Sequence, residues 1–402
     1  MKYWRGYLVA AIVAALTWGL VNFAKAHAVL VDMIYPYVTR FLQSALADWS
    51  STTPVLLWQL FALLLGAGIL ASIVLMIVLR WNPIQWFGWI VAVASIVYML
   101  HTAMWGLNYY AGDLADDIRL DVREYTVTEL KKATIYYRDK ANILANNISR
   151  DAAGKPAYPS FEALAEEVGE GFQTLTYDKA MSVFAGSTVP VKKLGWSDMY
   201  TSMGITGFTF AITGEAAVNP QIPAVSQPFT MAHEMAHRMS IASEQDANFA
   251  AFLACSVHSS PEIQYSAYFM AYRYCYNALA SASTSTAQKG AQEVKEGLDP
   301  LFAQDLADYN AFLVSSQKPK ASSVATTVND TYLKTSGDSS GVRSYGEVVD
   351  LLVSWHYQRE ILPTITQYEQ KFDPYDEKKV DLSGIVNARD PEPTQSSGGG
   401  VG

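Results

Sequence analysis

The chain has 402 residues, which is enough for a membrane anchor and one sizeable further domain. Half of the residues are hydrophobic and only 17% are charged, and the apolar residues concentrate in the first 110 positions. The net charge of −9 argues against nucleic acid as a partner, because phosphate binding needs a positive surface.

Three stretches near the N-terminus are long and apolar enough to cross a bilayer: residues 6–24, 55–79 and 84–105. Buried core helices are the alternative, but the second stretch runs 25 residues without a charge, which is unusual for a core helix. The sequence AKAHA at 24–28 is similar to a signal-peptidase site. The apolar stretch before it is long for a signal peptide, so an uncleaved anchor is predicted.

The basic residues near these spans predict their orientation. Lys2 and Arg5 precede the first span, and Arg80 lies in the short link between the second and the third. The positive-inside rule places both groups in the cytoplasm. A multi-pass protein of the cell membrane is therefore predicted, with a cytoplasmic N-terminus, an anchor over residues 1–110 and an extracytoplasmic domain that begins near residue 111.

Between the first two spans, residues 28–49 carry apolar side chains near helical spacing. Two placements are equally compatible with this pattern. The segment is either an amphipathic helix on the outer membrane surface, or a helix that packs against the extracytoplasmic domain.

The domain over residues 111–372 is predicted to be mainly helical with a small sheet. Strands are expected within residues 204–218, where apolar and small polar residues alternate between glycines. The two cysteines, Cys255 and Cys275, fall on successive helices at positions too far apart for a disulfide, so two free buried thiols are expected. Residues 373–402 are polar and glycine-rich and are predicted to be a disordered tail.

The stretch MAHEMAHRMSIASEQDANF, residues 231–249, carries the candidate chemistry. On a helix, His233 and His237 lie one turn apart on one face and can bind a single Zn²⁺. Glu234 is rotated to the side, where it can take a proton from an activated water as general base. The apolar neighbours of these residues oppose a solvated surface helix, and two buried histidines need partners.

A catalytic zinc site needs a third protein ligand and an open fourth position. Glu244 would lie about 10 Å beyond His237 on a straight helix, so the chain must turn between Arg238 and Ser243. A second helix that starts at Glu244 then brings this carboxylate to the histidines. Asn248, four residues on, is expected to bond a ligand histidine as a supporting residue.

The residues of this stretch resemble motifs of known families. HEMAH followed by EQDAN is similar to the gluzincin arrangement, HExxH plus Glu-x-x-Ala-Asp/Asn, of membrane-bound CAAX-type endopeptidases and of peptidases that cleave phage-type repressors. The chain also resembles an uncharacterised bacterial family, a domain of unknown function with three N-terminal spans and an external HExxH domain. The matching stretches include WGLNYY, TGFTFAITGEAAVN, VNDTYLK and GVRSYGEVVDLL.

The resemblance implies a zincin-like α+β domain, with zinc on His233, His237 and Glu244 and with Glu234 as general base. Two positions depart from the family pattern. Ser240 stands where glycine is usual, which puts the turn in doubt because glycine would form it more easily, and Asp246 stands where glutamate is frequent.

Other roles are less determined by the sequence. Residues 208–218 are a candidate strand for pairing with substrate, or else an ordinary core strand. Glu215 either binds a substrate amine or faces water. The candidates for stabilising the oxyanion are Tyr345, Arg343, His258 and Tyr268; Tyr345 is taken as the predicted catalytic partner of Glu234, and His356 is predicted to be structural.

The predicted function is therefore that of a membrane-anchored zinc metalloendopeptidase that hydrolyses peptide or protein substrates outside the cytoplasm. The alternative is a catalytically inactive receptor or scaffold at the cell surface that keeps zinc structurally; a fourth protein ligand would mark it. An intramembrane protease is excluded, because Arg238 and Glu244 follow the motif at once and no long apolar span contains it. Lipid bilayer is the other predicted partner, and the oligomeric state is left open.

Overall fold

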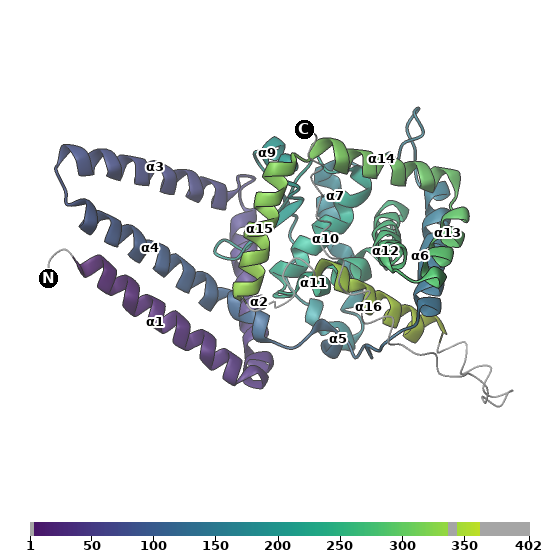
Figure 1. The fold of residues 1–402 in the computed structure, drawn as a ribbon, viewed down its shortest axis with the longest axis horizontal. Helices are drawn as coiled ribbons and strands as arrows, with labels where there is room; N and C mark the ends of the chain where they lie inside the picture. The colour runs from purple at the N-terminus through teal and green to yellow at the C-terminus, as the bar shows by residue number, and fades with distance from the viewer. Residues whose placement is uncertain (1–3, 337–343, 362–402) are drawn as a thin grey trace, which may run out of the picture.

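The computed structural model describes residues 4–336 and 344–361, and it divides into a helical stalk and a larger helical body (Figure 1). Three helices project from one end of the body: α1 (Arg5–Ala26), α3 (Leu57–Val78) and α4 (Pro83–Met104). Each of them is long and apolar enough to cross a membrane. The three predicted spans are thus confirmed as helices, and they indicate that the protein is membrane-associated.

Within the stalk, α1 and α4 pack side by side through small residues. Gly6 and Gly88 meet so closely that a Cβ added at Gly6 would lie 2.4 Å from the Gly88 carbonyl carbon. Ala10 and Ala92 are buried at the same crossing. Within a bilayer, the hydrophobic effect does not drive helices together, so their association depends on close packing. Small residues permit this close approach. In contrast, α3 buries none of its residues in the described part of the chain.

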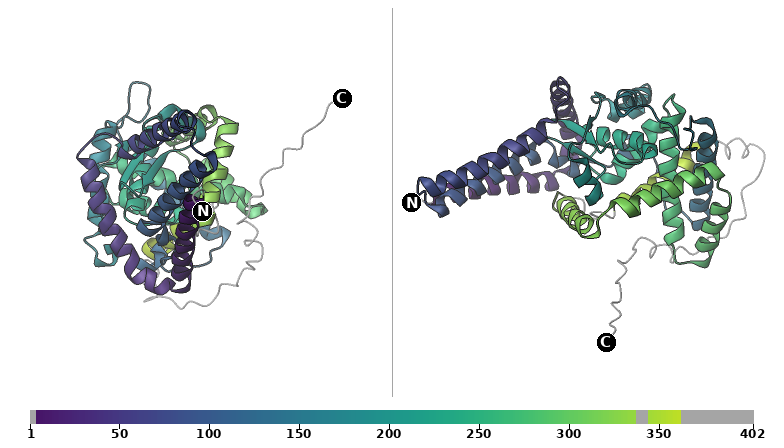
Figure 2. Two further views of the ribbon diagram at one scale, coloured as in Figure 1. Left: turned by 90° about the vertical axis from the view of Figure 1, so that its left-hand side faces the viewer. Right: turned by 90° about the horizontal axis from the view of Figure 1, so that it is seen from above.

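The helix α2 (Ala28–Ser51) runs across the ends of the stalk helices, between the stalk and the body (Figures 1 and 2). Its polar residues Thr39, Arg40 and Gln43 are buried against the body. Val31 and Ala47 are buried as well, but many of its other apolar residues point away, and Phe41 is 78% exposed. Of the two predicted placements, packing against the body is therefore observed, with an apolar face left uncovered on the other side.

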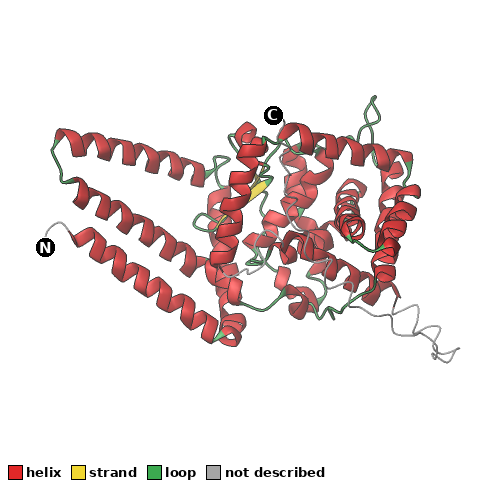
Figure 3. Cartoon of the chain, in the orientation of Figure 1, coloured by secondary structure: helices red, strands yellow, loops and turns green. Residues whose placement is uncertain are grey.

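The body is mainly α-helical (Figure 3). Its core surrounds α11, in which every residue from Asp246 to Cys255 is buried. Both cysteines are free and buried, as predicted. The helices of the body are α5 (Leu114–Asp117), α6 (Val127–Asn147), α7 (Phe161–Glu167), α8 (Gly169–Leu175), α9 (Ser197–Met203), α10 (Gln227–Arg238), α11 (Glu244–Ser256), α12 (Pro261–Ser281), α13 (Ser285–Glu296), α14 (Pro300–Ser316), α15 (Pro319–Ser336) and α16 (Ser344–His356).

A small sheet lies between α10 and the stalk. It contains β1 (Lys192–Lys193), β2 (Gly207–Phe210) and β3 (Glu215–Val218) in the order β1-β3-β2. β2 pairs antiparallel with β3, so the predicted strands are confirmed, whereas the two-residue β1 was not foreseen. β3 is central and fully buried, which leaves only β2 of the candidate segment 208–218 at a sheet edge.

Glu215 takes neither of the two roles that the sequence suggested, because its side chain is completely buried. It accepts hydrogen bonds from the backbone N–H groups of Leu57 and Trp58, at 2.8 and 2.9 Å, and from Thr213. Lys192 pairs with it at 2.6 Å. The carboxylate thus caps the N-terminus of α3, where the helix dipole favours a negative charge, and joins the sheet to the stalk.

Candidate metal centre

The candidate metal-binding motif lies on two consecutive helices joined by a tight turn. α10 carries His233 and His237, and α11 begins with Glu244, so the chain reverses between Arg238 and Ser243 as predicted. Ser243 caps α11 by accepting a hydrogen bond from the backbone N–H of Asp246. The turn itself places Ser240 in the left-handed region, with φ at 73°.

Three side-chain atoms of the motif converge on one point. His233 Nε2 and His237 Nε2 are 3.1 Å apart, and Glu244 Oε2 lies 3.2 Å from the first and 3.6 Å from the second. Ligands held at about 2.0–2.1 Å around a tetrahedral zinc ion are about 3.3–3.4 Å from one another. The spacing of the donor atoms therefore fits a zinc ion between them, and in the described residues no fourth His, Cys, Asp or Glu joins this group.

The surroundings of the group favour a positive charge at its centre. Burial alone would lower the pKa of His237, but the Glu244 carboxylate raises it to about 9. The pKa of Glu244 is held below its usual range by His237 and His233, although burial opposes this. His237 Nδ1 lies 2.8 Å from the carbonyl oxygen of Ile241, which only accepts hydrogen bonds, so Nδ1 carries the proton and Nε2 is left to bind a metal.

Glu234 lies beside this group and packs against the edge strand β2. Its Oε2 is 2.7 Å from the hydroxyl of Thr209, and a Cβ added at Gly207 would lie 2.4 Å from its Oε1. The carboxylate is therefore fixed in the space that Gly207 leaves free. Burial raises its pKa, against the opposing effect of the two histidines. A carboxylate in this setting can accept a proton and release it again.

The stalk and α2 hold the end of α10 in place through side chains to which the sequence analysis gave no role at the site. Trp105, the residue after α4, donates its indole N–H to the carbonyl oxygen of His237 at 3.0 Å. Arg40 donates to the carbonyl oxygen of Met239 at 3.2 Å, and Thr39 donates to the Ser240 hydroxyl at 2.9 Å. All three residues are distant in sequence, so no local pattern could reveal them.

The contact between Ser240 and Thr39 gives a testable prediction. Ser240→Gly removes the cost of a side chain in the left-handed region, about 1–2 kcal/mol, but loses a hydrogen bond worth about 0.5–1.5 kcal/mol. The two changes nearly cancel, so stability should be almost unchanged. Ser240→Ala keeps the backbone cost and loses the bond, and should be about 1–2 kcal/mol less stable than Ser240→Gly in denaturant unfolding of the detergent-solubilised protein. Equal stabilities of the two variants would contradict this account.

The predicted support from Asn248 is not formed among the described residues. Its Oδ1 accepts a hydrogen bond from the hydroxyl of Tyr274 at 3.2 Å, while the Nδ1 of His233 is buried without a hydrogen-bond partner. Tyr274 also packs on Phe229, one turn before His233; burial raises the pKa of Tyr274, and the charge of Glu244 adds a smaller effect in the same direction. Tyr274 is thus a hydroxyl close to the metal group that the sequence analysis missed.

Of the four predicted oxyanion donors, the structure describes the side chains of two, His258 and Tyr268, and both have partners away from the metal group. Tyr345 stands in the first turn of α16, but its side chain lies outside the described part, as does Arg343 entirely, so the role of Tyr345 stays a prediction. His258 is buried at the end of α11, where its Nε2 lies 3.0 Å from the carbonyl oxygen of Glu167. Tyr268 packs in an aromatic cluster with Tyr136, Tyr137 and His356, which agrees with a structural role for His356.

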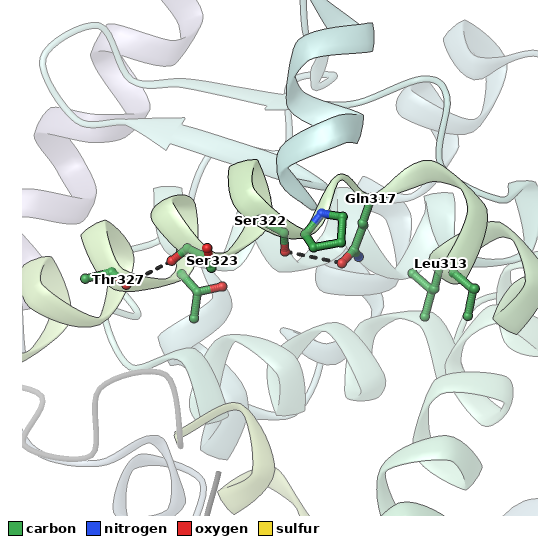
Figure 4. A pocket seen from close by; sticks show the side chains of 8 residues that line it. Leu313, Gln317, Ser322, Ser323 and Thr327 are labelled. Atoms are coloured by element: carbon green, nitrogen blue, oxygen red, sulfur yellow. Dashed lines mark hydrogen bonds between the residues drawn. The ribbon is translucent and has the colours of Figure 1, made fainter. Parts of the chain in front are cut away.

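An open hollow of about 730 Å³ lies where α14 meets α15 (Figure 4). It is lined by side chains such as Leu313, Gln317, Ser323 and Thr327. None of its lining residues belongs to the metal group or to β2. The hollow is therefore not assigned to the chemistry of the motif.

The fold and the site together define a membrane-associated, mainly helical protein with a His₂Glu group that could hold a metal ion, of which His237 and Glu244 are buried and His233 is partly buried. The family described as "Protein of unknown function (DUF3810)" matches residues 31–353, and the chain belongs to this family. Among curated proteins and among solved structures, no match was found.

Proposed function

We propose that the protein is a membrane-anchored zinc metalloendopeptidase. The convergence of the ligand atoms of His233, His237 and Glu244 within 4.8 Å of one another carries this proposal. The resemblance of HEMAH and EQDAN to the gluzincin arrangement supports it. Zinc held there would polarise a carbonyl group and activate water for attack near neutral pH.

The chain's own groups supply the proton transfers and the positioning. Glu234 takes a proton from the attacking water and delivers it to the leaving amine, with Thr209 and Gly207 holding the carboxylate in place. The substrate backbone pairs with the free edge of β2, which lies next to α10. Tyr274, and Tyr345 as predicted from the sequence, are the candidates to donate a hydrogen bond to the developing oxyanion.

The orientation of the chain is part of the proposal. Arg5 begins α1 and Arg80 lies in the link between α3 and α4, and these helix ends are remote from the body (Figure 1). Under the positive-inside rule, we propose that these ends face the cytoplasm. The body and its metal group then lie outside the cytoplasm. The alternative, an inactive zinc-binding receptor, would require a fourth protein ligand, and the described part of the chain offers three.

The proposal is tested by metal analysis and peptide cleavage on the full chain in detergent. We expect about one zinc ion per chain, with the metal lost from His233→Ala and from Glu244→Ala because two ligands hold zinc poorly. Cleavage of a degenerate peptide library should stop with a chelator and return with added zinc. His27→Ala, at an exposed histidine on the stalk, is the matched control and should keep both properties. Zinc binding without any cleavage would favour the receptor instead.

A further inference from the structure

The ends of two stalk helices directly contact the metal group's surroundings. Trp105 follows the last residue of α4 and donates its indole N–H to the carbonyl oxygen of the ligand His237. At the other helix, Trp58 lies in the first turn of α3 and packs on Phe208 and Phe210 of β2, with ring centroids 5.4 and 5.9 Å apart. Tryptophan is enriched at the boundary between bilayer and water. The strand and helix that carry the site therefore lie at the level where the membrane-length helices end.

The exposed face of α2 marks the same level. Its exposed apolar side chains form a continuous patch on the side away from the body: Val29, Leu30, Met33, Ile34, Tyr37, Val38 and Phe41. An apolar patch of this kind is unfavourable in water. The connections at both ends of α2 lead into membrane-length helices, α1 and α3, so the helix lies across their ends (Figures 1 and 2). A helix with one polar and one apolar face in this position fits the surface of a bilayer.

The polar face of α2, opposite this apolar patch, makes direct hydrogen bonds to the surroundings of the site. Thr39 and Arg40 bond the turn after His237, and Gln43 donates to the carbonyl oxygen of Ala211, the residue that follows β2, at 2.9 Å. One helix thickness, about 10 Å, thus separates the apolar face of α2 from the turn between the metal ligands. A peptide paired with β2 would form a further strand about 4.8 Å from β2, beside Phe208, which is 43% exposed.

We infer that the substrate is a polypeptide tethered to the membrane, cut within a few residues of the bilayer surface. The inference rests on the proposed function. A chain that leaves the bilayer next to α3 meets the free edge of β2 and the aromatic residues Trp58 and Phe208 at once. To bring a peptide bond far from the membrane to the same strand, the substrate chain would have to bend back toward the bilayer.

The first test varies the height of the cleaved bond above the membrane. The full chain is placed in phosphatidylcholine vesicles with zinc, and a degenerate 12-residue segment is offered in three forms. The first is attached to a single membrane-spanning helix directly, the second is attached through a rigid spacer of about 20 prolines, about 60 Å long at about 3.1 Å per residue, and the third is free in solution. The two tethered forms have the same surface concentration, so they separate height from mere enrichment at the membrane.

We expect the directly attached segment to be cleaved at least about ten times faster than the spaced one. Equal rates for the two tethered forms would overturn the inference while leaving the peptidase proposal intact. Cleavage of none of the three forms, with zinc bound, would reject the proposed function itself.

A second measurement does not depend on activity. Cys255 and Cys275 are completely buried, so a fluorophore on a single added surface cysteine reports one position. Labels at Phe41→Cys and Phe208→Cys should be quenched by spin-labelled lipid headgroups. A label at Lys289→Cys on α13, at the end of the body opposite the stalk, should not be quenched (Figure 1). Quenching at none of these positions would show that α2 and β2 lie away from the bilayer, as when a second copy of the chain covers them.

Discussion

Glu234→Gln should abolish peptide cleavage while leaving the metal content unchanged. The amide has nearly the same size as the carboxylate but cannot take a proton from water, and general-base catalysis contributes about 10²- to 10⁴-fold to the rate. Glu234 faces Thr209 and Gly207, and the metal group consists of three other residues. The loss should therefore appear in kcat, and zinc analysis should give the wild-type value.

A matched control separates catalysis from general damage. Glu162 lies in the first turn of α7 with a side chain that is 65% exposed, so Glu162→Gln should keep the wild-type rate. If Glu234→Gln cleaved the same peptides at a rate near wild type, Glu234 would not be the general base. If it lost its zinc as well, the carboxylate would act on the metal ligands and the role assigned to it would be wrong.

Glu215→Ala should destabilise the body of the protein by about 3–5 kcal/mol, the usual cost of removing one partner of a buried ion pair. The substitution leaves Lys192 charged with 12% of its side chain exposed, and it takes the shared acceptor from Leu57 and Trp58 at the start of α3. The sheet would then lose the two hydrogen bonds that link it to the backbone at the start of α3. Unfolding in denaturant, followed by tryptophan fluorescence in detergent, measures the change.

The double variant makes this test specific to the ion pair. Glu215→Gln alone leaves Lys192 without its charge partner, whereas Glu215→Gln combined with Lys192→Met removes both charges. The double variant should be more stable than Glu215→Gln, because it leaves no uncompensated buried charge. If the effects of Glu215→Gln and of Lys192→Met, each measured alone, simply added in the double variant, the interaction between the two residues would contribute nothing to stability. In addition, limited proteolysis should cut the link at residues 52–56 faster in Glu215→Ala, since the cap on α3 holds this link together with the bond from Lys192 to the carbonyl oxygen of Val55.

Several elements followed from the sequence because their signals are local. Long uncharged stretches predicted α1, α3 and α4, and alternating residues between glycines predicted β2 and β3. The reversal between Arg238 and Ser243 followed from geometry, since a straight helix would carry Glu244 away from His237. The structure also explains the departure at Ser240, whose positive φ suits glycine and whose hydroxyl accepts the bond from Thr39.

The identity of the edge strand depended on the order of the strands in the sheet, and no periodic pattern in the sequence predicts this order. The sequence predicts residues 208–218 as the candidate strand for substrate pairing. In the structure only β2 lies at the sheet edge, because β3 lies between β1 and β2. Gly207 was the one available signal, because a glycine inside an alternating strand often marks a close approach of another group. Here that group is the Glu234 side chain.

By itself, the sequence determined the membrane-length helices, the helical body, and the face on which His233, His237 and Glu244 can meet, because each depends on residues within a few turns of one another. Only the tertiary structure decided that Glu215 is a buried cap on α3, that Asn248 bonds Tyr274, and that α2 turns its polar face inward. These features are contacts between residues far apart in the chain. Their partners are selected by how the elements pack, and no local spacing records that choice.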